Sequence, residues 1–110
     1  MGIIHLLIFI LFNIGITSAD FIQVNENGFG TNINITIQAM KIFNNYLYAG
    51  TENLTTGSEI WRSFDGHHWT NISQASNGFG DGNNDRLDTL VTFNGQLFAG
   101  TYNWNTGCEV

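Results

Sequence analysis

The stretch "FNNYLYAGT" at residues 43–51 decides the fold, because it returns as "FNGQLFAGT" at residues 93–101. In both copies, two residues that tolerate positive φ stand between two apolar runs. This is the signature of a β-hairpin with a two-residue turn. The sequence therefore predicts one hairpin in each copy, 50 residues apart.

The repetition extends well beyond the hairpin. When residues 27–60 are aligned with residues 77–110, 15 of 34 positions are identical without a gap. "NGFG" opens each copy, and "TGSEI" or "TGCEV" closes it. Chance would give about two or three identities at ordinary amino-acid frequencies. A fixed period of this length indicates a repeated supersecondary unit.

Each unit reads as short strands separated by turns. In the first copy the expected strands are "TIQAMKIF", "YLYAGT", "SEIWRS" and "WTNIS". Four short antiparallel strands in about fifty residues are typical of one blade of a β-propeller. A propeller closes with about four to eight such blades. The predicted fold class is therefore all-β. Residues 27–76 form a complete blade, residues 77–110 form an incomplete one, and the chain is expected to be a fragment.

Residues 20–26 stand immediately before the first "NGFG", where "WTNIS" stands before the second. We therefore expect residues 20–26 to supply an outer strand. Propellers often close by letting one terminal strand complete the blade formed by the other end. The predicted propeller region thus spans residues 20–110.

The first nineteen residues are expected to be a signal peptide. Residues 3–16 are an apolar run of suitable length, and small Thr17 and Ala19 precede the expected cleavage before Asp20. The run is interrupted and short for a membrane span, which needs about 20 apolar residues. An uncleaved anchor or a core element are the alternatives. We expect a secreted or cell-surface protein with no membrane span after cleavage.

Three glycosylation sequons agree with export, although a chain rich in Asn, Thr and Ser also forms them by chance. They begin at Asn34, Asn53 and Asn71. One cysteine, Cys108, offers no disulfide within the chain and stands where the first copy has Ser58, as a small residue in a strand. The net charge of −6 repels phosphate backbones and argues against nucleic-acid binding.

The "SFDGHHW" stretch at residues 63–69 resembles the Asp-box of sialidase-like propellers, Ser-x-Asp-x-Gly-x-x-Trp. Ser63, Asp65, Gly66 and Trp69 match in type, with one residue missing between Asp and Gly. The segment at residues 44–51 is similar to the kelch-like entry into the second strand of a blade. The resemblance implies a structural hairpin at the blade periphery, not a catalytic acid. An Asp in such a turn accepts backbone N–H bonds.

The histidines of that stretch, His67 and His68, are interpreted as solvated turn residues. The other metal candidate is "DGNND", where Asp81, Asn83 and Asp85 alternate like the start of a calcium loop. Arg86 stands where an EF-hand needs Gly, so a solvated loop is favoured. The sequence therefore predicts no cofactor and no metal site, with a Ca²⁺ or sugar contact at these three residues as the alternative.

Several polar residues recur at equivalent places, where they can either ring a central channel or hold hydrogen bonds between blades. We favour the structural role because every blade has the same packing problem. The recurring pairs are Thr51 and Thr101, Asn53 and Asn103, and Glu59 and Glu109.

We therefore expect a non-catalytic binding or scaffolding module for an extracellular carbohydrate or protein. One alternative is a sialidase-like glycoside hydrolase whose active site lies mostly outside this chain. That enzyme would need an arginine cluster and two carboxyl groups, and only Arg62 and Arg86 are available here. The other alternative is a structural surface-layer or adhesion repeat.

Overall fold

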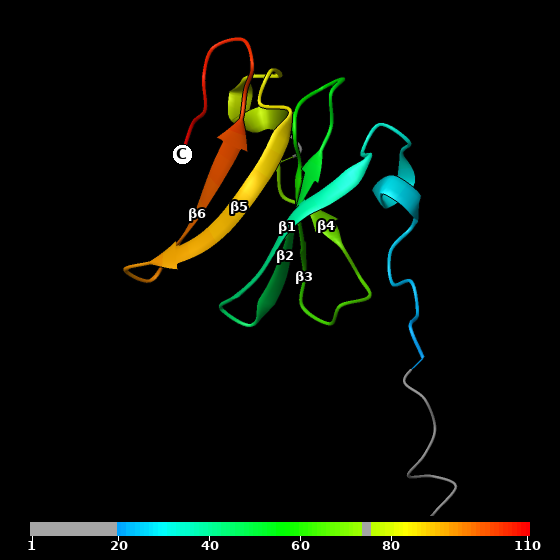
Figure 1. Ribbon diagram of the computed structural model, residues 1–110. Helices are drawn as coiled ribbons and strands as arrows, with labels where there is room; N and C mark the ends of the chain where they lie inside the picture. Colours follow the sequence, from blue (N-terminus) through cyan, green and yellow to red (C-terminus); the bar gives the residue numbers. More distant parts are fainter. Residues whose placement is uncertain (1–19, 74–75) are drawn as a thin grey trace, which may run out of the picture.

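The structure, a computed structural model, describes residues 20–73 and 76–110, so the predicted signal peptide lies outside the described residues. The described chain is all-β, with six strands in one antiparallel sheet (Figure 1). The strands are β1 (Thr36–Phe43), β2 (Tyr46–Glu52), β3 (Ile60–Ser63), β4 (Thr70–Asn71), β5 (Arg86–Phe93) and β6 (Gln96–Tyr102). Two short 3-10 turns, η1 (Asn27–Gly30) and η2 (Asn77–Gly80), precede β1 and β5. Over these residues the structure has no helix of the length and apolar character needed to cross a bilayer.

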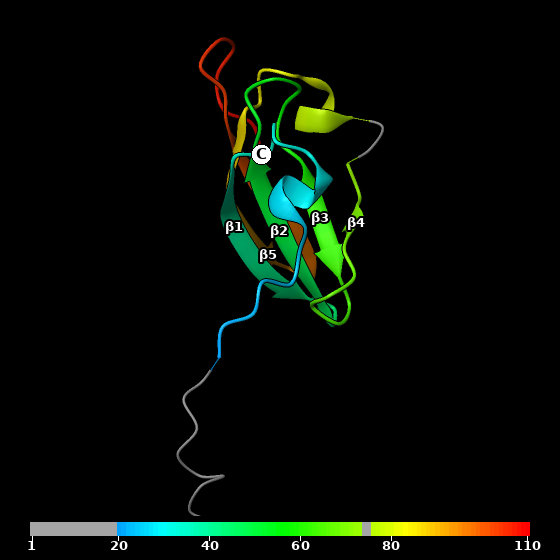
Figure 2. The same ribbon diagram turned by 90° about the vertical axis from the view of Figure 1, so that its right-hand side faces the viewer.

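The first unit is an antiparallel meander in which β1 pairs with β2, β2 with β3 and β3 with β4. Figure 2 shows these four strands side by side, in front of β5. The β1–β2 turn has φ of 47° at Asn44 and 64° at Asn45, as a type I′ turn requires. The hairpin therefore lies where the Asn-Asn pair predicts it. The fourth strand is shorter than its predicted range.

The second unit repeats the hairpin in β5 and β6. Both hairpins carry an irregularity of register near the start of their first strand, between Ile37 and Ala39 in β1 and between Leu87 and Thr89 in β5. The sheet continues from one unit to the next through the pair Glu52 and Arg86. The two hairpins therefore share their strand lengths and the position of the register irregularity.

The core lies between the units and consists of Tyr48, Ile60, Leu87 and Leu90. It forms where β2 and β3 of the first unit face the second unit (Figure 1). Gly50 makes the close approach possible: a Cβ atom there would lie 2.6 Å from Leu87 Cδ2. Burying this apolar face is what joins two units that cannot shield it alone.

Backbone hydrogen bonds also join the units at their loop end. Asn53 N–H donates to Asp85 O at 2.7 Å, and Ser58 N–H donates to Asn84 O at 2.7 Å. A Cβ atom at Gly57 would lie 2.9 Å from Gly78 N, so the two backbones touch. At the other end, the two hairpin turns bound an open pocket of about 570 Å³, lined by residues 42–45 and 92–95.

Residues 20–26 are not in a strand, and Phe21 and Ile22 are exposed. The outer strand expected here would pair with a segment that is not among the described residues, so this strand stays a prediction. One local prediction needs correction. Cys108 is a free, exposed thiol in the loop that follows β6, not a strand residue. Ser58, its counterpart, likewise lies in the loop before β3. Closure of a blade by residues 20–26 stays a prediction.

Candidate functional site

Asp65 organises the turn between β3 and β4. Its Oδ1 accepts hydrogen bonds from the backbone N–H groups of His67 and His68, both at 2.8 Å. The Ser63 hydroxyl donates to the same oxygen at 3.1 Å and accepts from the Gly66 N–H at 2.8 Å. Gly66 has φ of 80°, where glycine is favoured. These groups form a self-contained turn.

The same contacts hold the Asp65 carboxylate in its ionised form. The backbone N–H of His68 is the largest cause that lowers the pKa of Asp65, followed by the His68 ring, whose Nδ1 lies 2.6 Å from Asp65 Oδ2. A general acid needs a pKa near the working pH. These hydrogen bonds therefore favour a structural role for Asp65 in the turn over a role as a general acid.

Four polar side chains form a buried network in the first unit: Asn34, Thr51, Asn53 and Glu59. Asn34 Nδ2 donates to Glu59 Oε2 at 2.7 Å and to Gly28 O at 3.1 Å. Asn34 Oδ1 accepts from Asn53 Nδ2 at 3.0 Å and from Thr51 Oγ1 at 3.3 Å. Because buried polar groups must find partners, this network fixes the loop before β1 to the loop after β2.

The second unit contains the same network, formed by Asn84, Thr101, Asn103 and Glu109. Asn84 Nδ2 donates to Glu109 Oε2 at 2.7 Å and to Gly78 O at 2.8 Å. Asn84 Oδ1 accepts from Asn103 Nδ2 at 3.0 Å and from Thr101 Oγ1 at 3.2 Å. The recurring Thr, Asn and Glu residues thus hold each unit together. The central asparagine of each network was missed from the sequence, although it also recurs at the 50-residue period.

This network bears on two of the three predicted glycosylation sites. Asn34 and Asn53 are buried, and the Nδ2 of each donates a hydrogen bond inside the protein. A glycan is attached through that nitrogen and is bulky, so it needs a surface position. The folded structure disfavours both sites. Asn71 is half-buried at the end of β4, and its use stays a prediction.

Glu59 connects the network to two further elements. Its Oε2 also accepts the indole N–H of Trp61 at 2.8 Å. Its Oε1 accepts from Asn77 Nδ2 at 3.2 Å, which reaches η2 of the second unit. One buried carboxylate therefore fixes an aromatic ring in β3 and links the first unit to the second.

Three aromatic rings meet over β3 and β4. Phe29 of η1 stacks on Trp61 with ring centroids 4.5 Å apart and an angle of 9° between the planes. The ring centroids of Trp69 and Phe29 lie 5.5 Å apart in an edge-to-face arrangement with 64° between the planes. Phe29 takes a positive φ of 55°, which the hydrogen bond from its N–H to Glu26 O at 2.9 Å supports. The indole Nε1 of Trp69 is buried and has no hydrogen-bond partner in the described chain.

A pocket of about 470 Å³ opens beside these rings. One side consists of residues of the N-terminal segment: Gln23, Val24, Asn25 and Glu26. The other side consists of the three rings and the turn residue His67. Apolar ring faces beside amide, carboxylate and imidazole groups suit a ligand that presents both C–H surfaces and hydrogen-bonding groups. Of the residues singled out in the sequence, Trp69 and His67 line this pocket.

The calcium candidates lie elsewhere, in the loop before β5. Asp81 Oδ1 accepts from the Asn83 N–H at 2.9 Å, and its Oδ2 accepts from Asn103 Nδ2 and Thr106 Oγ1, both at 3.0 Å. These donors, the Asn83 N–H first, lower the pKa of Asp81. Within residues 20–73 and 76–110, no group of three or more His, Cys, Asp or Glu residues is placed to hold a metal. The calcium alternative at Asp81, Asn83 and Asp85 gains no support.

The two arginines each cover a tyrosine of their own unit. The Arg62 guanidinium lies 4.4 Å from the Tyr46 ring centroid, and that of Arg86 lies 4.1 Å from Tyr102. Neither lines the aromatic pocket, in which Glu26 is the single carboxylate.

Comparisons with protein-family models, with curated proteins and with solved structures find no match for this chain. The described fold defines an all-β protein whose six strands form one antiparallel sheet.

Proposed function

We propose that this chain is part of a secreted or cell-surface β-propeller and acts as a non-catalytic module that binds carbohydrate. The aromatic pocket beside Phe29, Trp61 and Trp69 carries the proposal. The meander of β1 to β4 and the 50-residue period support a blade. The apolar start of the sequence supports export.

The chemistry of the pocket suits a sugar better than a purely apolar ligand. Ring faces pack against the C–H face of a pyranose, and the amide oxygens of Gln23 and Asn25 can accept hydrogen bonds from hydroxyl groups. The Gln23 Nε2 already donates to Asn25 O and Asn27 Oδ1, which holds the side chain in place. Glu26 adds an acceptor, and His67 adds a group that can donate or accept. An anionic glycan is less suitable, because the lining contains no lysine or arginine.

Binding without turnover follows from the same lining. Hydrolysis of a glycosidic bond generally uses two carboxyl groups about 5–9.5 Å apart. The pocket has one carboxylate, Glu26, and the nearby Asp65 is engaged by its own turn. We therefore expect the pocket to hold a sugar and release it unchanged.

The test is a glycan array probed with the full chain, followed by titration of each bound oligosaccharide against tryptophan fluorescence. Gln23→Ala and Asn25→Ala should each weaken binding at least about tenfold, since each leaves a sugar hydroxyl unpaired. Both side chains lie at the N-terminal side of the pocket, away from the core, so the fold should be kept.

Trp104→Phe is the matched control, because Trp104 is 82% exposed and lies outside the pocket. It should leave the affinity unchanged. Loss of binding in Trp104→Phe together with unchanged binding in Gln23→Ala would show that the sugar binds outside the aromatic pocket. Cleaved product in a mass spectrum would instead favour the glycoside hydrolase alternative.

A further inference from the structure

The sequence contains three Asn-Gly peptides, at residues 27–28, 77–78 and 94–95. In such a peptide the glycine nitrogen can attack the asparagine side-chain amide, because glycine has no side chain to obstruct the approach. The nitrogen gives its proton to a solvent base, an N–Cγ bond forms, and the Cγ–Nδ2 bond breaks with release of ammonia. Water then opens the cyclic imide at either carbonyl, which gives aspartate or isoaspartate. The structure places the three peptides in different environments.

The peptide Asn77-Gly78 is closed to this reaction. The attacking atom, Gly78 N, donates its hydrogen bond to Ser58 O at 2.8 Å. The leaving group, Asn77 Nδ2, donates to Thr56 Oγ1 at 3.1 Å and to Glu59 Oε1 at 3.2 Å. The first unit therefore holds both groups that would have to move.

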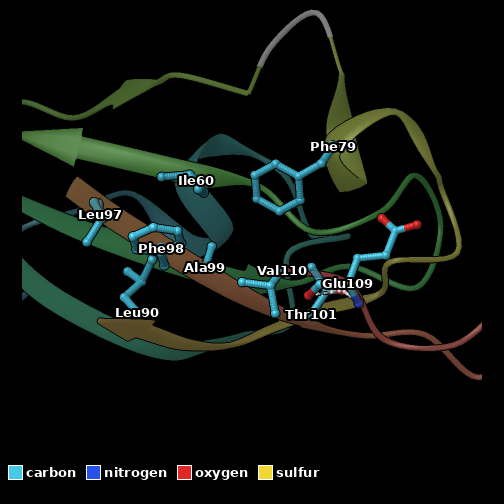
Figure 3. A pocket seen from close by; sticks show the side chains of 9 residues that line it. All are labelled: Ile60, Phe79, Leu90, Leu97, Phe98, Ala99, Thr101, Glu109 and Val110. Carbon is cyan, nitrogen blue, oxygen red and sulfur yellow. Dashed lines mark hydrogen bonds between the residues drawn. The ribbon is translucent and has the colours of Figure 1, made fainter. Parts of the chain in front are cut away.

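The rest of η2 is fixed against the first unit as well. A Cβ atom at Gly57 would lie 2.9 Å from Gly78 N, so the backbones are packed against each other. Phe79, the next residue, lines a pocket of about 320 Å³ together with Ile60 of β3 (Figure 3). Ring closure at Asn77 would thus require the two units to separate locally.

The peptide Asn94-Gly95 is open to the same reaction. Both residues are exposed and form the turn between β5 and β6, with φ of 48° and 71°. The strands pair up to Phe93 and Gln96, so the two turn residues lie outside the ladder. Neither the Gly95 N–H nor the Asn94 side chain has a hydrogen-bond partner among residues 20–73 and 76–110. A Cβ atom at Gly95 would meet nothing within 4 Å, so space for the rearrangement is available.

The turn of the first hairpin is a natural comparison. Asn44 holds the place of Asn94 and has nearly the same φ, 47°. It is followed by Asn45, whose side chain obstructs attack by its own backbone nitrogen. Asn44 and Asn45 are exposed although the second unit packs beside the first, so a neighbouring unit does not cover a turn of this kind.

We propose that Asn94 is a site of spontaneous deamidation and that the product loosens the β5–β6 hairpin. Isoaspartate carries the main chain through its own Cβ atom, which adds a backbone atom to the two-residue turn. Loop length and turn type set the register of a hairpin. The pairing of Phe93 with Gln96 should therefore weaken first.

The test incubates the full chain in mildly alkaline buffer and follows each asparagine by mass spectrometry of proteolytic peptides. Asn94 should convert at least about tenfold faster than Asn77, because three hydrogen bonds must open before Asn77 can react. Asn27 should fall between them, since its Oδ1 accepts from Gln23 Nε2 at 2.9 Å.

Two turn variants and one charge control sharpen the test. Gly95→Asn should suppress conversion at Asn94, and Asn45→Gly should start it at Asn44. Asn94→Asp introduces the charge of the product without the extra backbone atom. The Phe93 and Gln96 amides should therefore exchange hydrogen faster in the incubated chain than in Asn94→Asp.

Three outcomes overturn the proposal. One is faster conversion at Asn27 or Asn77 than at Asn94. Another is equal conversion at Asn44 and Asn94 in the native chain, which would remove the part of Gly95. The third is unchanged amide exchange after Asn94 has converted, which would show that the product leaves the hairpin intact.

Discussion

Leu87 in β5 is fully buried, whereas Ile37, which holds the same place in β1, is 45% exposed. Leu90 and Met40 differ in the same way, at 8% and 51%. The buried asparagine networks of the two units, by contrast, have the same donors and acceptors. Each unit therefore organises its own polar interior, but its apolar face depends on a neighbour. Four experiments can break or sharpen this comparison.

Replacing Leu87 and its counterpart Ile37 by alanine should give the largest difference in the free energy of unfolding. Leu87→Ala removes a fully buried side chain that packs against Gly50, and should cost about 2–5 kcal/mol in the free energy of unfolding. Ile37→Ala removes an exposed one and should cost less than about 1 kcal/mol. Urea denaturation of the two variants measures the difference. Equal losses would show that β1 also has a packed outer face.

The paired glutamates should differ by a smaller amount. Glu59→Gln places an amide among three donors, from Asn34, Trp61 and Asn77, and should cost about 1–3 kcal/mol. Glu109→Gln affects an exposed side chain and should change stability by less than about 0.5 kcal/mol. The urea midpoints of the two variants measure both losses of stability. A larger loss for Glu109→Gln than for Glu59→Gln would contradict the assignment of Glu59 as the residue that links the two units.

Exchange of the turn residues tests whether the hairpins are equivalent. Asn45 has φ of 64° and Gly95 has φ of 71°, so both occupy the left-handed region. Asn45→Gly should stabilise the protein by a few tenths of a kcal/mol, and Gly95→Asn should destabilise it by a similar amount. Thermal unfolding of both variants is the measurement. Changes of the same sign would mean that the two turns are not interchangeable.

The smallest effect concerns Asp65, whose turn has no counterpart in the described second unit. Its pKa is lowered on folding, so its stabilising contribution is complete above the unfolded pKa of about 3.9 and declines as the pH falls through the lower folded pKa. The difference in urea midpoint between the native chain and Asp65→Asn should therefore shrink steadily below about pH 4. A difference that stays constant with pH would contradict the proposed charge effect.

The sequence predicts the all-β class and both hairpins, because turn residues and apolar alternation are local signals. The outer strand expected at residues 20–26 stays a prediction, since a strand needs a partner edge and the expected partner is not among the described residues. Residues 27–73 do form the four-stranded antiparallel order that the pattern indicates.

The candidate site could be predicted only in part. Trp69 was singled out for its place in the "SFDGHHW" stretch, but Phe29 and Trp61 were not recognised as its neighbours. Their contact joins η1 to β3 across thirty residues and depends on the positive φ of Phe29. The recurrence of that phenylalanine in both "NGFG" turns is the signal that could have revealed it.

The touching backbones at Gly57 and Gly78 have a geometric consequence. The units meet there without side chains between them, whereas their hairpin turns stand apart around an open pocket. Together they make a wedge, narrow at the loops and broad at the turns. A third unit added through the same contacts would tilt in the same sense, so the pair already sets a curvature that a larger side chain at either glycine would flatten.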